Sequence, residues 1–180
     1  VDGLCLPATG PILLHGYEEP VGGKWIDETI PGKMGAIDRN SGETIWSNPC
    51  EVGYGRGFGA GFGRVHNAVV LGPSNSSHRA VRMDINSGEL LMSQDIPAFD
   101  HALVFPDLCF CITPDRVIAI STDDFSEVWI HRAKRQRFHM IARQAERLFV
   151  VFSDVETKKQ GVLVLDALGG DDMGVWVDPA

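Results

Sequence analysis

The sequence predicts an all-β protein built from about four repeated units of four antiparallel strands each. Its apolar runs are short, rich in Val, Ile, Leu and Phe, and bounded by Gly, Pro, Asn or Asp. Such bounded runs are typical of strands rather than helices. The composition agrees, because 20 of the 180 residues are Gly and 10 are Pro. A hairpin motif that returns along the chain is the third observation.

The motif is clearest in residues 36–46, AIDRNSGETIW, where Asp38, Gly42 and Trp46 frame a compact turn. The Asp38 carboxylate can accept hydrogen bonds from backbone N–H groups two residues further on. Gly42 supplies the positive φ that such a hairpin requires. Trp46 lies on the strand after the turn, where a large side chain can pack on a neighbouring sheet. These residues predict a strand, a turn and a second strand that carries a packing side chain.

The motif recurs in residues 82–92, RMDINSGELLM, which keep Asp84 and Gly88 and have Met92 in place of the Trp. Two looser copies are residues 119–129, with Ser121, Phe125 and Trp129, and residues 164–176, with Asp166 and Trp176. Copies that return about every 40 to 50 residues indicate an array of supersecondary units.

A unit of this length has room for four short strands, which is the size of a propeller blade. A β-sandwich with two similar hairpins is the alternative, but a sandwich gives no reason for Trp to return at the same offset. We therefore predict a β-propeller region over the whole chain. The expected blades are residues 1–49, 50–97, 98–136 and 137–180.

The pattern A-x-D-x-x-[ST]-G-x-x-x-W resembles the tryptophan-docking repeat of propellers of the pyrroloquinoline-quinone (PQQ) type. That group includes quinoprotein alcohol and glucose dehydrogenases and non-catalytic relatives such as the outer-membrane barrel-assembly lipoprotein. The resemblance covers all four segments and is closest in residues 36–46. It implies that Trp46, Trp129 and Trp176 dock one blade onto the next, and it favours a periplasmic or extracellular location.

Propellers that this sequence resembles have seven or eight blades, so four blades make a half or a fragment of a ring. Open blades leave unpaired edges and bare faces. The chain is then part of a longer polypeptide, or two copies complete an eight-bladed ring, or four blades close alone. We favour the first two, and we expect no lone open monomer because its end faces would expose apolar surface.

Residues 53–63, GYGRGFGAGFG, have Gly at every second position. As a strand, this segment presents bare backbone on one face, which suits a planar or anionic ligand beside Arg56 and Arg64. A connector or a crowded inner strand is the preferred interpretation. The segment is no phosphate loop, because no Gly-Lys-Ser/Thr follows it.

His101 and His139 occupy similar places in consecutive units and are expected at the start of innermost strands, near the central channel. Paired imidazoles there could bind a metal or shuttle protons. No His-x-His or His-Glu-x-x-His spacing accompanies them, so we prefer structural, hydrogen-bonded His and predict no metal site.

The sequence contains four cysteines, which are Cys5, Cys50, Cys109 and Cys111. The Cys-x-Cys pair on a strand points both thiols to one face, about two strand rises apart and too far for an easy disulfide. Cys5 and Cys50 could form a disulfide, and free buried thiols are the alternative. Quinoprotein alcohol dehydrogenases of the family carry a disulfide between adjacent cysteines, which this sequence lacks, and that puts their activity in doubt here.

Net charge and hydropathy bear on which partners the protein can have. A net charge of −8 argues against nucleic acid as a partner. No run reaches the roughly 20 apolar residues of a membrane-spanning helix. The basic segment 131–137 is expected to be a loop, either solvated or docking an acidic partner.

Two functions follow from these observations. The preferred one is a non-catalytic scaffold that binds a protein or ligand, completed by further blades or a second copy. The alternative is part of a quinoprotein oxidoreductase that uses PQQ and calcium on alcohols or sugars. The resemblance implies Glu, Asn and Asp ligands around calcium, and no such set can be placed on this sequence. Enzyme activity is therefore uncertain, and no cofactor is assigned.

Overall fold

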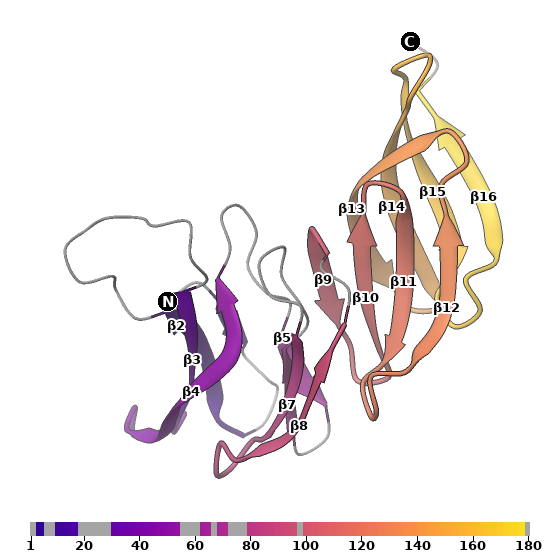
Figure 1. The fold of residues 1–180 in the computed structure, drawn as a ribbon. Coiled ribbons are helices and arrows are strands. Elements are labelled where there is room, and N and C mark those ends of the chain that lie inside the picture. The colour runs from indigo at the N-terminus through magenta and orange to yellow at the C-terminus, as the bar shows by residue number, and fades with distance from the viewer. Residues whose placement is uncertain are drawn as a thin grey trace.

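The computed structural model describes residues 3–5, 10–17, 30–54, 62–65, 68–71, 79–96 and 99–178, which form sixteen strands and no helix (Figure 1). The first sheet holds β1 (Gly3–Cys5), β2 (Ile12–Tyr17), β3 (Ile30–Ile37) and β4 (Thr44–Tyr54). The second holds β5 (Phe62–Val65), β6 (Ala68–Leu71), β7 (Arg79–Asp84) and β8 (Leu90–Asp95). The third holds β9 (His101–Val104), β10 (Leu108–Thr113), β11 (Arg116–Ser121) and β12 (Glu127–Arg132). The fourth holds β13 (Gln136–Gln144), β14 (Arg147–Asp154), β15 (Gln160–Asp166) and β16 (Asp172–Val177).

Each sheet is an antiparallel meander in which neighbouring strands are also neighbours in the sequence. This confirms the predicted all-β class of four-stranded antiparallel units. The part of the chain that the structure describes contains no helix long and apolar enough to cross a membrane.

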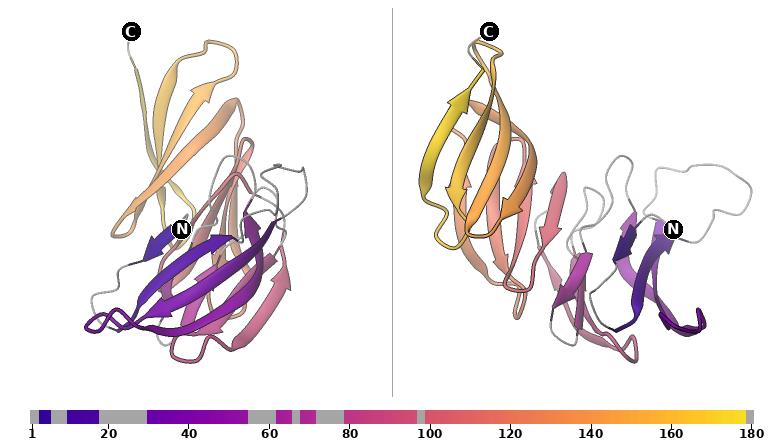
Figure 2. Two further views of the ribbon diagram at one scale, coloured as in Figure 1. Left: turned by 90° about the vertical axis from the view of Figure 1, so that its left-hand side faces the viewer. Right: turned by 180° about the vertical axis from the view of Figure 1, so that it is seen from behind.

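The four sheets follow one another in chain order, with the first and the fourth at opposite ends of the array (Figures 1 and 2). The first strands of consecutive sheets lie side by side, because β1 contacts β5, β5 contacts β9, and β9 contacts β13. The fourth strand of each sheet therefore lies at the outer rim. This is the arrangement of propeller blades around a common axis.

Among the described residues, three apolar clusters fill the spaces between consecutive sheets. The first cluster is Leu13, Met34, Ala36, Trp46, Val81, Met83 and Ile85. The second is Ala80, Ile96, Phe99, Ala102, Cys109, Cys111, Ile118, Ile120 and Phe125. The third includes Phe110, Ile112, Trp129, Phe138, Leu148, Phe152 and Leu165. Because side chains alternate along a strand, β10 contributes to two clusters at once, and all six of its residues are buried.

The motif turns share one geometry. Asp38 Oδ1 accepts hydrogen bonds from the backbone N–H groups of Asn40 at 2.9 Å and Ser41 at 2.8 Å. These two bonds, Ser41 first, hold the pKa of the Asp38 carboxyl below its ordinary value. The Gly42 N–H donates to the Asp38 carbonyl at 2.9 Å, and Gly42 has a φ of +74°. Asp84 binds its turn in the same way, and Gly88 has a φ of +71°.

The same turn also occurs where the sequence motif is not recognisable. Between β14 and β15, Asp154 Oδ1 accepts from the N–H groups of Glu156 at 2.9 Å and Thr157 at 2.7 Å. Lys158 takes the place of the Gly, with a φ of +62°. The Asp carboxylate is therefore what this turn shares with the motif turns, because a non-Gly residue fills the left-handed position.

Candidate functional site

The first and second sheets are joined by Trp46, whose side chain is 8% exposed. Its indole Nε1 donates to the carbonyl of Ile85 in the next sheet at 2.9 Å. Asn48, two residues further along β4, donates from Nδ2 to the Gly88 carbonyl at 2.9 Å. A Cβ built on Gly88 would lie 2.6 Å from two atoms of the indole ring. The ring therefore covers the turn that follows β7.

The third and fourth sheets are joined in the same way. Trp129 is 9% exposed, and its Nε1 donates to the Ala167 carbonyl at 3.2 Å. A Cβ on Gly170 would lie 2.6 Å from the Trp129 ring. An ion pair adds to this contact, because Arg143 binds both carboxylate oxygens of Asp107, at 2.6 and 2.8 Å.

The contact between the second and third sheets, which we call the second junction, is built differently. Met92 stands where the other two junctions have Trp, and Phe125 stands where they have Gly. A third change accompanies them, because Arg82 pairs in register with Met92, whereas Ala36 pairs with Trp46. Three positions of the docking motif are therefore altered together at one junction.

Arg82 supplies hydrogen bonds at the place that an indole N–H would reach. Its Nη1 donates to the carbonyl and to the carboxylate of Asp123, each at 3.1 Å, and lies 3.5 Å from the Thr122 carbonyl. Thr122 occupies the motif position that Ile85 occupies at the first junction, because Thr122 directly follows Ser121 and Ile85 directly follows Asp84. The guanidinium thus supplies a hydrogen-bond donor in place of the missing indole. It does so from β7, the strand that pairs with Met92 of β8.

Phe125 has an unusual backbone for a bulky residue. Its φ is +57°, and its side chain is 2% exposed. A non-Gly residue in this region costs about 1–3 kcal/mol and persists only where its surroundings hold it. Here the Phe125 N–H donates to the Ser121 carbonyl at 3.1 Å, and Asp124 Oδ1 accepts from the Ser126 hydroxyl at 2.7 Å. The turn keeps the Phe ring between the sheets.

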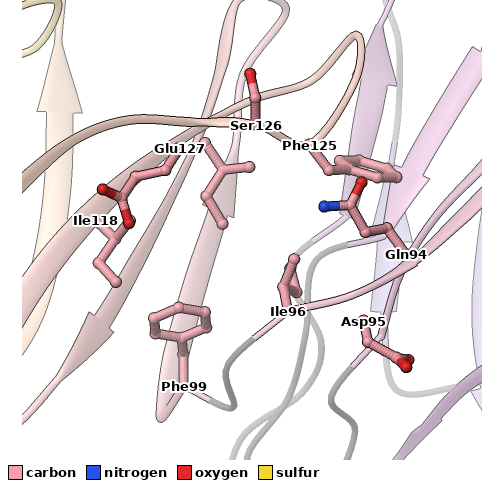
Figure 3. Close-up of a pocket in the computed structure, with 9 residues that line it drawn as sticks. Gln94, Asp95, Ile96, Phe99, Ile118, Phe125, Ser126 and Glu127 are labelled. Atoms are coloured by element: carbon pink, nitrogen blue, oxygen red, sulfur yellow. The ribbon is translucent and has the colours of Figure 1, made fainter.

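A pocket of about 210 Å³ opens at the second junction (Figure 3). We call it the junction pocket, and its lining residues are Gln94, Asp95, Ile96, Phe99, Ile118, Ile120, Phe125, Ser126 and Glu127. Figure 3 shows that both sheets and the segment between them contribute side chains to it. An apolar cavity of about 150 Å³ holds benzene, whereas sites for drug-sized ligands begin near about 300 Å³. The pocket is therefore sized for one side chain or one ring.

The wall and the rim of the junction pocket differ in polarity. Its isoleucines and both phenylalanines belong to the buried cluster between the second and third sheets. At the rim, Gln94, Asp95, Ser126 and Glu127 are exposed. Asp95 is paired with Arg79 Nε at 2.9 Å. The result is an apolar hollow with an acidic mouth.

Restoring the Trp–Gly pair at the second junction is expected to be cooperative. Met92→Trp alone should destabilise the chain by about 1–3 kcal/mol, because the Phe125 ring already fills the space. Phe125→Gly alone should also destabilise it, because a buried ring is lost. The triple variant with Met92→Trp, Phe125→Gly and Arg82→Ala should be less destabilised than the sum of the single-variant costs predicts, by about 0.5–3 kcal/mol. Urea unfolding of the variants measures this coupling, and additive costs would contradict it.

The sequence offered two basic residues, Arg56 and Arg64, as ligand-binding candidates. Arg56 lies outside the described residues. Arg64 lies in β5 opposite Val69, and its side chain is not among those described. A ligand site at this Gly-rich segment stays a prediction.

The two candidate channel histidines differ in their positions. His101 is the first residue of β9, and its partial burial lowers the pKa of its imidazole. His139 lies within β13 at a bulge rather than at its start, and its Nε2 is hydrogen-bonded to Ser153 Oγ at 2.8 Å. Within the part of the chain that the structure describes, no three His, Cys, Asp or Glu side chains converge as metal ligands would.

The Cys-x-Cys pair lies in β10, and both thiols are free and buried. Their sulfur atoms are 3.7 Å apart, closer than two strand rises because the side chains lean toward each other. Burial raises the pKa of the Cys111 thiol. The side chains of Cys5 and Cys50 are outside those described, so a bridge between them stays a prediction.

Trp176, which was expected to dock between sheets, is 58% exposed on the outer strand of the last described sheet, so its docking role stays a prediction. It pairs in register with Val162, while Gly174 pairs with Val164 at the place where the motif has Trp. The two extra residues in the last copy therefore move the ring along the strand. Strands occupy the basic segment 131–137 except at residues 133–135, so the expected loop is limited to these three residues.

Sequence reasoning did not single out Gln94, Ile96 or Phe99 as pocket residues. The sequence did contain a signal for this pocket, because aligning the copies shows Met92 in place of Trp in one unit and Phe125 in place of Gly in the next. Paired departures in neighbouring repeats mark the junction that those repeats share.

No family model and no curated protein matches the chain. Among solved structures, it is similar to quinohemoprotein alcohol dehydrogenase from Comamonas testosteroni, with 11% identity over 83% of this chain and 33% of that one, at a TM-score of 0.57. It is also similar to dihydro-heme d1 dehydrogenase NirN in complex with DHE, with 13% identity, 83% and 35% coverage and a TM-score of 0.60. BamB from Moraxella catarrhalis matches with 12% identity, 84% and 62% coverage and a TM-score of 0.48.

The chain thus spans between about a third and about three fifths of the length of these proteins. Identities this low speak for the fold and not for the activity. Together with the four stacked meanders, the likenesses support a β-propeller fold for this chain.

Proposed function

We propose that the chain is a non-catalytic propeller scaffold that binds part of another molecule in the junction pocket. The observation that carries this proposal is the pocket itself, an apolar hollow of about 210 Å³ at the junction where the Trp–Gly pair is replaced. Apolar hollows with a few polar groups that fix the ligand's orientation are the usual form of binding sites. The surrounding strands are paired on rigid sheets, which suits a preformed site.

Methyl NMR of the whole chain tests this function with indole as the probe. We expect the isoleucine methyl signals of Ile96, Ile118 and Ile120 to shift saturably, because these side chains line the pocket. Ile112 is the internal control, since it is buried between the third and fourth sheets. Gln94→Trp places a large ring at the mouth and should abolish the shifts. A folded chain whose pocket methyl groups ignore indole would contradict the proposal.

The rival function, a quinoprotein oxidoreductase, is tested with the same protein. PQQ and calcium are added, and the melting temperature and dye reduction with alcohols and sugars are measured. The scaffold predicts no saturable rise in melting temperature and no reduction. A saturable rise accompanied by dye reduction would favour the enzyme.

A further inference from the structure

We propose that the natural occupant of the junction pocket is an extended peptide that inserts one apolar side chain and places a basic side chain beside Glu127. This inference rests on the proposed scaffold function and names its class of partner. Three features of the second junction support it: the size of the hollow, the charge of its mouth, and the free edge of β8.

The hollow accepts one side chain of a particular kind. Phe99 and Phe125 are 1% and 2% exposed, so both rings are held by packing in the wall of the pocket. Figure 3 shows Phe99 and Ile118 on one side of the space, with Ile96 and Phe125 on the other. A Leu or Phe side chain gains favourable contacts with such a wall, whereas a polar one would lose its water.

The mouth of the pocket attracts a cation. The turn before β12 reads Asp123-Asp124-Phe125-Ser126-Glu127, in a chain of net charge −8. Arg82 neutralises Asp123, but no described Arg or Lys forms an ion pair with Asp124 or Glu127. Glu127 lines the pocket and is exposed. A Lys or Arg next to the inserted side chain would meet this carboxylate, which favours basic over acidic peptides.

The backbone beside the pocket suits an extended partner. β8 is the last strand of its sheet, so one of its edges has no neighbour among the described strands. Its residues Gln94 and Asp95 line the pocket, and Leu90 and Leu91 on the same strand are 48% and 53% exposed. An extended peptide can pair with such an edge through backbone hydrogen bonds while a side chain enters the adjacent hollow.

The test is an array of acetylated heptapeptides of alternating Thr and Ser. Their central residue is Leu, Phe or Ala, and its two neighbours are Lys, Gln or Glu. We expect the whole chain to bind peptides with central Leu or Phe and neighbouring Lys about tenfold more tightly than peptides with central Ala or neighbouring Glu. Glu127→Lys should reverse the charge preference. Glu89→Lys is the matched control, because it changes the net charge equally in the preceding hairpin and should leave the preference unchanged.

The outcomes separate this inference from the function on which it rests. If indole enters the pocket but the array shows no preference for an apolar residue beside Lys, the peptide class is wrong and the scaffold function stands. If Glu89→Lys abolishes the preference as strongly as Glu127→Lys, basic peptides are attracted by the net negative charge of the chain. The assignment of the preference to Glu127 then fails. If indole does not enter, both proposals fail.

Discussion

Replacing Trp129 with Ala is expected to lower the free energy of unfolding by about 3–5 kcal/mol, the usual cost of deleting a buried aromatic ring. The ring is 9% exposed, packs over the turn at Gly170, and lies 5.9 Å from Phe110, centroid to centroid. Its loss also leaves the Ala167 carbonyl without the indole donor. Urea unfolding followed by circular dichroism measures the cost.

Trp176→Ala is the matched control. This ring is carried by the outer strand of the last sheet and is 58% exposed. Its removal should change stability by no more than about 0.5 kcal/mol in the isolated monomer, as for other surface substitutions. If Trp129→Ala cost as little as Trp176→Ala, Trp129 would not dock the third sheet on the fourth.

Gly88→Asn is expected to be far more destabilising than Gly42→Asn, although both glycines occupy the left-handed region, with φ of +71° and +74°. Asn tolerates that region, so backbone strain is small at either site. The difference lies in the space around them. A Cβ at Gly88 would lie 2.6 Å from the Trp46 ring, while a Cβ at Gly42 has nothing within 4 Å.

The Asn side chain at position 88 must therefore displace the indole, at an overpacking cost of about 1–3 kcal/mol. Thermal or urea unfolding of the two variants gives the comparison. Equal costs at the two sites would show that Trp46 does not press on the second sheet. Gly→Val at both positions serves as the reference for backbone strain, because Val does not tolerate a positive φ.

The sequence predicted the fold class because its information is local and repeated. Asp38 and Gly42 determine a turn within a few residues. The same pattern recurs at Asp84 and Gly88, which indicates a second unit of the same kind. Apolar runs between such turns then indicate strands. Each of these inferences needs no knowledge of which sheet lies next to which.

The junction pocket could not be predicted in this way, because its residues meet only when two sheets pack. Phe125 sits in a motif position that its own unit does not explain, and its ring is held by a neighbouring sheet. The same limit applies to the turn at Asp154, where Lys158 replaces Gly and no Trp follows. Contacts between units decide these features, and a single repeat does not contain them.

The far face of the fourth sheet follows from the same packing pattern. Met140, Val151, Val162 and Trp176 pair in register straight across the sheet. Met140 and Trp176 are both 58% exposed. The opposite face of this sheet packs against the third sheet. We propose that the exposed row packs on another propeller sheet, from a longer polypeptide or from a second copy of the chain.

Sedimentation velocity of the 180-residue chain over a range of concentrations tests the open array of propeller blades most directly. Exposed apolar rows of this kind drive association, so we expect species heavier than the 19.7 kDa monomer. Trp176→Glu together with Met140→Glu should shift them toward the monomer, because two carboxylates then interrupt the row. A single 19.7 kDa species at every concentration, unchanged by these substitutions, would contradict an open array.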